Sequence, residues 1–187
     1  MPVLDWAPFI LVGGKSSRYG SDKSQALFEG QTLLDHAIGT IRELDREPRL
    51  VGLDSNSMSE LGLAAIPDEV PHQGPVAGIV AAAKASEEGW GLFLPVDMPK
   101  ISKKHLILLL AQPDSSPNQG GFAFQAASGF QYRLPCLIHL AILREIKKQP
   151  PSLGGLLRVI RAGWMILENH GFSDADFLNI NRPSDLG

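Results

Sequence analysis

Cysteine is almost absent from this sequence: Cys136 is the only one in 187 residues, so no disulfide can form within the chain. Folding is therefore not expected to need an oxidising compartment, and Cys136 is interpreted as a small buried hydrophobe rather than a catalyst. The histidines are few and scattered, without the spacing of a zinc site. They are His36, His72, His105, His139 and His170.

Long apolar runs and a strong net charge are also missing. No apolar run approaches the roughly 20 residues that cross a membrane, and the first residues, Met-Pro-Val-Leu-Asp-Trp, lack the pattern of a signal peptide. The net charge is only −3, which gives no electrostatic reason to expect nucleic acid or an anionic membrane as a partner. We expect a cytoplasmic protein.

What the sequence does contain is enough apolar material for a folded core. Hydrophobic residues make up 44% and charged residues 20% of the chain, which are ordinary values for a globular protein. A length of 187 residues fits one domain better than two, since domains commonly span roughly 100–200 residues. We therefore expect a single domain over residues 1–187.

In the first 110 residues, short apolar runs alternate with helical patterns. Thr32 and Ser102 precede two of these patterns and are expected N-caps. The alternation predicts a parallel sheet covered by helices on both faces. The expected fold is thus α/β, a three-layer Rossmann-like domain with a mainly parallel sheet. Expected strands cover residues 8–12, 49–53, 63–66 and 91–96, and expected helices cover 33–44, 76–85 and 102–110.

The second half of the sequence is less regular. Residues 121–125 and 129–133 are expected to form a hairpin around Ala127-Ser128-Gly129. An amphipathic helix is predicted over residues 137–148, ended by two prolines. Another helix is predicted over 153–160, and closing strands over 164–167 and 177–180.

A glycine-rich loop follows the first predicted strand, after Leu11 and Val12. Glycines at this point, Gly13 and Gly14, let backbone N–H groups approach phosphate oxygens. Ligands commonly bind at the carboxyl ends of the strands in α/β sheets. Lys15, Arg18 and Lys23 add three cations within nine residues. The loop is therefore a candidate phosphate-binding site, although a plain glycine turn with solvated charges would also contain such residues.

Two common phosphate loops do not match this segment. A P-loop requires glycine five positions before Gly14-Lys15-Ser16, where this chain has Phe9. A dinucleotide fingerprint starting at Gly13 requires glycine at positions 15 and 18, which are Lys15 and Arg18. The second mismatch disfavours a hydride-transfer dehydrogenase.

The segment from Gly13 to Lys23 reads Gly-Gly-x-Ser-x-Arg-x-Gly-x-Asp-Lys. This pattern after an N-terminal strand resembles the signature of the molybdenum cofactor guanylyltransferases and their nucleotidyltransferase relatives. Val12 and Tyr19 stand where that family usually has alanine and methionine. Both departures concern packing and the shape of the nucleotide site rather than the phosphate chemistry.

Two further stretches resemble the family in the same order. Asp68 follows Ile66-Pro67, and a Gly-Pro-Val-Ala-Gly segment ending at Gly78 comes next; glycine at position 78 is explained about equally well by close helix packing. Pro95-Val96-Asp97-Met98-Pro99 resembles the family's Pro-x-Asp-x-Pro. A carboxylate at the end of a buried strand suits Mg²⁺, which binds one or two carboxylates plus phosphate oxygens and water. The alternative, that Asp97 caps the next helix, is weaker because Ser102 is the better cap.

The last matching stretch runs from Asn179 to Leu186 and resembles the family's Asn-x-Asn-x-Pro-x-Asp-Leu. The resemblance implies that Asn181 is a second oxygen ligand of Mg²⁺ and that Asn179 lines the acceptor side. Two asparagines at these positions favour the guanylyl branch over the cytidylyl branch. Gln131-Tyr132-Arg133-Leu134-Pro135 corresponds to the family's acceptor-facing strand, with Leu134 departing from the usual residue.

Together these motifs imply an enzyme that transfers GMP from Mg²⁺-GTP to the phosphate of molybdopterin, with cofactor-handling or molybdoenzyme-chaperone proteins as further partners. Arg18, Lys23 and Asp97 would be catalytic, and Asp97 and Asn181 would hold the metal. A relative that uses CTP, UTP or ATP with another phosphorylated acceptor, or a nucleotide-binding module without turnover, stays open at this stage. The residues implied around the nucleotide are Leu11, Val12, Gly13, Gly14, Lys23, Asp68, Gly78, Asp97, Asn179 and Asn181.

Overall fold

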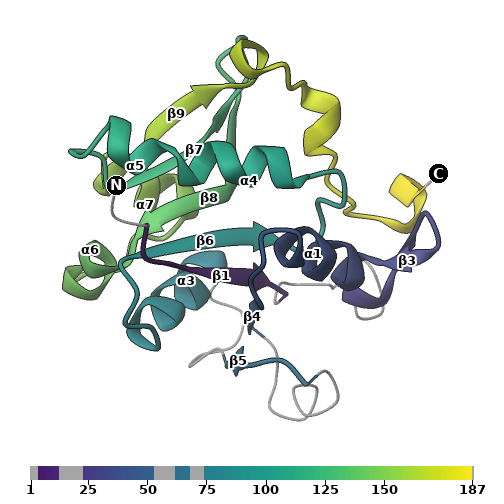
Figure 1. Cartoon of the computed structure of the whole chain (residues 1–187), viewed down its shortest axis with the longest axis horizontal. Helices are drawn as coiled ribbons and strands as arrows, with labels where there is room; N and C mark the ends of the chain where they lie inside the picture. Colours follow the sequence, from purple (N-terminus) through teal and green to yellow (C-terminus); the bar gives the residue numbers. More distant parts are fainter. Residues whose placement is uncertain (1–3, 13–22, 53–61, 68–73, 187) are drawn as a thin grey trace.

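The computed structural model describes residues 4–12, 23–52, 62–67 and 74–186. Its main feature is a seven-stranded sheet with the order β5-β4-β1-β6-β8-β7-β9 (Figure 1). Four of the six neighbouring pairs are parallel, so the mainly parallel sheet predicted from the sequence is confirmed. The strands are β1 (Trp6–Leu11), β4 (Arg49–Val51), β5 (Ala65–Ile66), β6 (Trp90–Pro95), β7 (Gly121–Gln125), β8 (Gln131–His139) and β9 (Gly163–Ile166).

Helices cover both faces of this sheet, which confirms the three-layer arrangement (Figure 1). On β1, Ile10 packs into a core with α1 and α4, whereas Phe9 and Leu11 pack into a core with α3, α6 and α7. This division follows from the alternation of side chains along a strand. Among the described residues, none of the helices is long and apolar enough to cross a bilayer. The helices are α1 (Leu33–Arg42), α3 (Pro75–Lys84), α4 (Lys103–Leu110), α5 (Gln112–Ser115), α6 (Leu140–Glu145) and α7 (Leu153–Val159).

Both expected helix caps are confirmed. The Thr32 side chain accepts a hydrogen bond from the backbone N–H of Asp35 at the start of α1. Ser102 precedes α4 and forms a capping box with His105, whose Nδ1 accepts from the Ser102 N–H. Each cap satisfies N–H groups that the first turn of a helix leaves without partners.

Several short elements complete the described chain. A two-stranded hairpin, β2 with β3, precedes α1 and was not predicted from the sequence. Short 3-10 helices lie before it and after β9. These elements are η2 (Lys23–Gln25), β2 (Leu27–Phe28), β3 (Gln31–Thr32), η3 (Leu167–His170), η4 (Asp174–Phe177) and η5 (Pro183–Leu186).

Two predicted elements are wrong. The helix predicted over 137–148 begins only at Leu140, because β8 continues through Leu137 and Ile138 between β6 and β7. Both residues are fully buried, and a short run buried on both faces does not reveal its period in the sequence. The strand predicted over 177–180 is the end of η4 followed by an irregular segment. Cys136 lies buried in β8, where burial raises the pKa of its thiol, as expected for a core residue.

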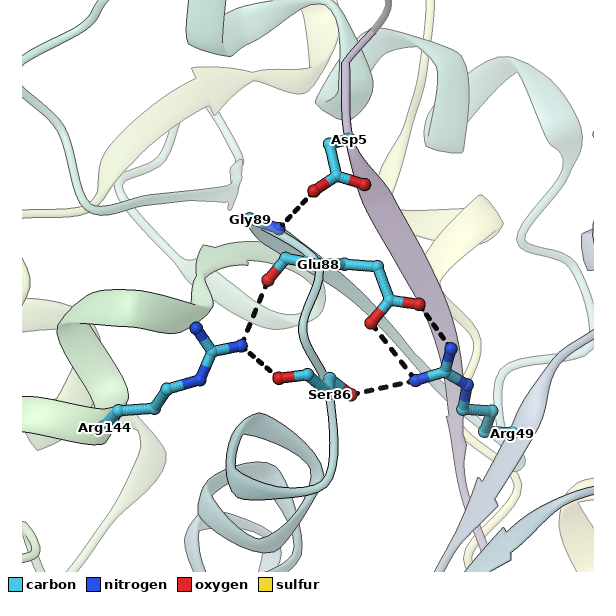
Figure 2. A network of polar contacts seen from close by, with 6 residues as sticks. All are labelled: Asp5, Arg49, Ser86, Glu88, Gly89 and Arg144. Atoms are coloured by element: carbon cyan, nitrogen blue, oxygen red, sulfur yellow. Dashed lines mark hydrogen bonds and ion pairs between the residues drawn. The ribbon is translucent and has the colours of Figure 1, made fainter.

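A polar network lies where β4 and β6 begin (Figure 2). We call Arg49, Ser86, Glu88 and Arg144 the strand-start cluster. The Arg49 guanidinium donates to both oxygens of the Glu88 carboxylate and to the Ser86 hydroxyl. Burial alone would raise the pKa of Glu88, but the bonds from Arg49 hold it below its ordinary value. Arg144 donates to three backbone carbonyls at and beyond the end of α3, those of residues 83, 86 and 88.

Candidate active site

Three polar side chains from distant parts of the chain meet just beyond the end of β6. The Lys23 Nζ donates to Asp97 Oδ2 at 2.8 Å and to Asn181 Oδ1 at 3.3 Å. These partners are 74 and 158 residues from Lys23 in the sequence. We call Lys23, Asp97 and Asn181 the strand-end cluster.

The fold fixes Asp97 through the strand that precedes it. Val96 is 5% exposed, and its N–H donates to the carbonyl of Leu11 at 3.2 Å, which joins the ends of β6 and β1. The Asp97 side chain remains 22% exposed and that of Lys23 17% exposed. The ion pair is therefore half-buried, at the carboxyl edge of the sheet where α/β proteins bind ligands.

Lys23 is placed by the short helix η2. The Lys23 carbonyl accepts a hydrogen bond from the N–H of Ala26 at 3.1 Å, and the next residue, Ser24, is 2% exposed. This buried neighbour anchors the turn, while the long lysine side chain reaches across to Asp97. The cation thus comes from a short anchored turn and its carboxylate partner from a rigid strand.

Asn181 is positioned by the backbone on both sides of it. Ile180 is fully buried, and its N–H donates to the carbonyl of Asp97 at 2.9 Å. On the other side, Asp185 Oδ2 accepts from the N–H groups of Asn181 and Arg182, each at 2.8 Å. Sequence reasoning missed Asp185, although its place in the Asn-x-Asn-x-Pro-x-Asp-Leu motif was a signal.

Asn179 does not join the strand-end cluster in the described structure. Its Oδ1 is buried and has no hydrogen-bond partner among the described residues. A buried amide oxygen without a donor costs free energy on the order of 1–3 kcal/mol. A hydrogen-bond donor that reached this atom would therefore be stabilising.

The other predicted residues fall into two groups. Leu11 ends β1, and Val12 follows it with its N–H bonded to the carbonyl of Val51 at 2.9 Å. Gly78 is buried within α3. None of these three is bonded to the strand-end cluster. The predictions for Gly13, Gly14, Arg18 and Asp68 lie outside the described residues.

The donor set of the strand-end cluster fits Mg²⁺. A carboxylate oxygen and an amide oxygen converge on one cationic group, the Lys23 ammonium, and oxygen atoms are the ligands that Mg²⁺ prefers. Within the described residues, no group of three or more His, Cys, Asp or Glu side chains could hold a metal ion. A site with few protein ligands is typical of Mg²⁺ that is bound together with phosphates.

Comparison with known families and proteins shows what the chain as a whole is similar to. A family model described as "MobA-like NTP transferase domain" matches residues 8–168. A "Probable molybdenum cofactor guanylyltransferase" of Deinococcus radiodurans is 32% identical over 179 residues, covering 95% of this chain and 90% of that protein. A protein of Bacillus cereus with the same name is 26% identical, covering 96% and 93%.

Solved structures show the same fold. Molybdopterin-guanine dinucleotide biosynthesis protein A from Archaeoglobus fulgidus matches with a TM-score of 0.73 and 22% identity, over 96% of this chain and 94% of that one. The 2-C-methyl-D-erythritol 4-phosphate cytidylyltransferase from Thermus thermophilus matches with a TM-score of 0.60 and 14% identity, over 95% and 94%. At these identities the likeness concerns the fold alone.

Proposed function

The chain belongs to the MobA-like NTP transferase family and is a nucleotidyltransferase. We propose that it transfers GMP from GTP to the phosphate of molybdopterin. The observation that supports the proposal best is the strand-end cluster, in which a carboxylate and an amide oxygen converge on one cation. The names of the most similar relatives supply the nucleotide and the acceptor. A single domain over residues 1–187, acting in the cytoplasm, would contain the whole site.

In this proposal Asp97 and Asn181 hold Mg²⁺. When bound there, the ion would supply positive charge to the phosphate oxygens around the reacting phosphorus. Lys23, with Arg18 from the glycine-rich loop, would neutralise the charge that grows on the leaving pyrophosphate. To do so, Lys23 exchanges its bonds to Asp97 and Asn181 for bonds to phosphate oxygens, which its flexible side chain permits.

The chemistry needs no general base. A phosphate oxygen of the acceptor is already anionic near neutral pH and attacks the α-phosphorus in line. The new P–O bond forms as the bond to the bridging oxygen of the β-phosphate breaks, and pyrophosphate leaves with that electron pair. Catalysis is then positioning and charge stabilisation.

The remaining nucleotide contacts of this proposal come from the family resemblance. We assign them to Leu11, Val12, Gly13, Gly14, Asp68 and Gly78, with Asn179 toward the acceptor. The buried Oδ1 of Asn179, which has no partner within the described part of the chain, supports a ligand-facing role, because an N–H or O–H group of a bound molecule would satisfy it.

The first test is a thermal-shift panel of GTP, CTP, ATP and UTP, each with and without Mg²⁺. A ligand that binds only the folded state raises the free energy of unfolding by RT ln(1 + [L]/Kd), about 2.7 kcal/mol at one hundred times Kd. We expect the largest shift with GTP and Mg²⁺, followed by pyrophosphate release when molybdopterin is added. Asp97→Ala should lose the Mg²⁺-dependent part of the shift, and Asp114→Ala, an exposed carboxylate on α5, should keep it.

Each other outcome has a definite meaning. A larger shift with CTP, UTP or ATP would overturn GTP as the donor while leaving the transferase mechanism in place. The absence of any Mg²⁺-dependent shift would overturn the proposed metal site and the reaction together.

A further inference from the structure

The proposed metal ligand Asn181 lies in a segment without regular structure. Residues 178–181 belong to no helix or strand, and the Asn181 residue is exposed. Its side chain therefore receives little support from packing. The position of its Oδ1, 3.3 Å from the Lys23 ammonium, depends on how the backbone around residue 181 is held.

Only one side of that backbone is held by the sheet. The buried Ile180 and its bond to the Asp97 carbonyl fix the approach to Asn181. Beyond Asn181 the chain turns into η5, and the bonds that define this turn are those made by Asp185. A turn with one fixed end still rotates, and rotation would move the Asn181 amide away from Asp97.

Asp185 closes the turn with reciprocal hydrogen bonds. One carboxylate oxygen accepts from two consecutive N–H groups, those of Asn181 and Arg182, both at 2.8 Å. The Asp185 N–H in turn donates to the Arg182 carbonyl at 2.9 Å. Hydrogen bonds to an ionised carboxylate are shorter and stronger than neutral ones.

We propose that Asp185 is a positioning residue for the proposed reaction: its carboxylate fixes the Asn181 backbone so that the Asn181 amide oxygen and the Asp97 carboxylate converge on one cation. The inference rests on the proposed function, because it presumes that these two oxygens bind the metal. Asp185 acts through Asn181 and does not itself contact the reacting atoms.

A matched control exists in the same part of the chain. Asp176 also closes a 3-10 turn, where its Oδ2 accepts from the Ser173 N–H at 2.8 Å and from the Ser173 hydroxyl at 3.3 Å. Asp176 makes the same kind of bond, but its turn does not contain a residue of the strand-end cluster. Loss of either carboxylate removes a local cap, and only loss of Asp185 should change metal binding.

The test measures Mn²⁺ affinity by electron paramagnetic resonance, with the nucleotide that stabilises the wild type most. Asp185→Ala should weaken Mn²⁺ binding roughly tenfold to a hundredfold, which is the usual effect of losing a residue that orients a metal ligand. Asp185→Asn keeps an oxygen that can accept from both N–H groups and should stay within about threefold of the wild type. Asp176→Ala should match the wild type. Equal Mn²⁺ affinities for Asp185→Ala and Asp176→Ala would overturn the proposal.

A double-mutant cycle separates positioning from a general loss of stability. If Asp185 acts through Asn181, then Asp185→Ala should add little to the loss of Mn²⁺ affinity already caused by Asn181→Ala. Additive losses would overturn the proposal. Should Asp185→Ala fail to fold, Asp185→Glu keeps the charge but shifts the oxygens by one methylene, and it is subject to the same cycle.

The wild type and Asp97→Ala distinguish this inference from the function on which it rests. If wild-type protein binds no Mn²⁺ with any nucleotide, or if Asp97→Ala binds it equally well, the proposed metal site is wrong. If both behave as proposed and Asp185→Ala keeps wild-type affinity, only the role of Asp185 is wrong.

Discussion

The two ends of β6 carry polar clusters of similar composition but opposite character. At its start, the Arg49 and Arg144 guanidiniums bond to the Glu88 carboxylate, the Ser86 hydroxyl and backbone carbonyls (Figure 2). At its end, the single flexible side chain of Lys23 bridges one carboxylate and one amide. In the strand-start cluster, two planar guanidinium groups bind acceptors that belong to the fold. In the strand-end cluster, the cation is a flexible lysine side chain that can change partners.

This difference is the reason that we propose a functional role for the strand-end cluster and a structural role for the strand-start cluster. The presence of charge does not distinguish the two clusters, since both contain an ion pair. They differ in whether their hydrogen bonds connect secondary-structure elements to one another. Arg144 ties α6 to the end of α3. The Lys23 ammonium, between a carboxylate oxygen and an amide oxygen, occupies a position that another cation would also suit.

The largest expected effect comes from removing the carboxylate of the strand-end cluster. Asp97→Ala should lower kcat by about a thousandfold or more, because several kcal/mol of charge stabilisation from the bound metal are lost. The melting temperature without ligand should change little, since the pair is only partly buried and Lys23 keeps its bond to Asn181. Pyrophosphate release and thermal melts measure the two quantities. Near-normal Mg²⁺-dependent turnover would contradict the proposed role of Asp97.

The second largest effect tests whether Lys23 exchanges partners during the reaction. Lys23→Ala should lower kcat/KM for the nucleotide by roughly ten- to a hundredfold, because a charge-assisted bond to phosphate is lost. Steady-state kinetics with varied nucleotide measure this. Lys104→Ala, which removes an exposed lysine on α4, is the control and should leave kcat/KM unchanged. Equal values for the two variants would mean that the bond to Asp97 is only structural.

The third prediction concerns the strand-start cluster and should affect stability alone. Arg144→Ala should lower the free energy of unfolding by about 1–3 kcal/mol, because three backbone carbonyls lose a charged donor. Urea denaturation measures this, with Arg158→Ala, an exposed arginine on α7, as control. The kcat of Arg144→Ala should stay within about twofold of the wild type. A large fall in kcat at unchanged stability would break the division between the two clusters.

The smallest expected effect lies in neither cluster and concerns His105. Burial lowers the pKa of His105 below its ordinary value of 6.5, although the nearby Asp176 charge acts in the opposite direction. The unfolded chain therefore binds a proton near pH 6.5 that the folded protein does not, so the free energy of unfolding should fall as the pH drops below that value. His105→Asn should flatten this dependence in urea titrations at several pH values. His170→Asn, at an exposed position, should not.

The fold was predictable wherever an element's own residues decide its structure. The run before Gly13 gave β1, and Thr32 and Ser102 marked the starts of α1 and α4. Local hydrogen bonds and alternation of side chains are sufficient there. The predictions failed where neighbouring strands determine the structure of a segment. Leu137 and Ile138 extend β8 because β6 and β7 lie on either side of it, which local sequence cannot show.

The candidate site was partly predictable for a related reason. A resemblance in motifs pointed to Lys23, Asp97 and Asn181, and the structure brings these three together; their roles stay predictions. Asp185 stood in a recognised motif, but its role was missed because its partners are backbone N–H groups, which every residue except proline has and which the sequence therefore does not single out. That Asn179 Oδ1 has no partner among the residues described by the structure likewise becomes visible only in three dimensions.

The wide sequence separation within the strand-end cluster also has a kinetic consequence. Asp97 and Asn181 are 74 and 158 residues from Lys23 in the sequence. Contacts between distant residues form late because long loops must close first. During refolding, the two oxygens should converge only after β1 and β6 have paired and Ile180 has docked. Metal affinity should therefore appear in the slowest phase, after most secondary structure has formed. A partly folded chain would then neither sequester nucleotide nor begin the transfer.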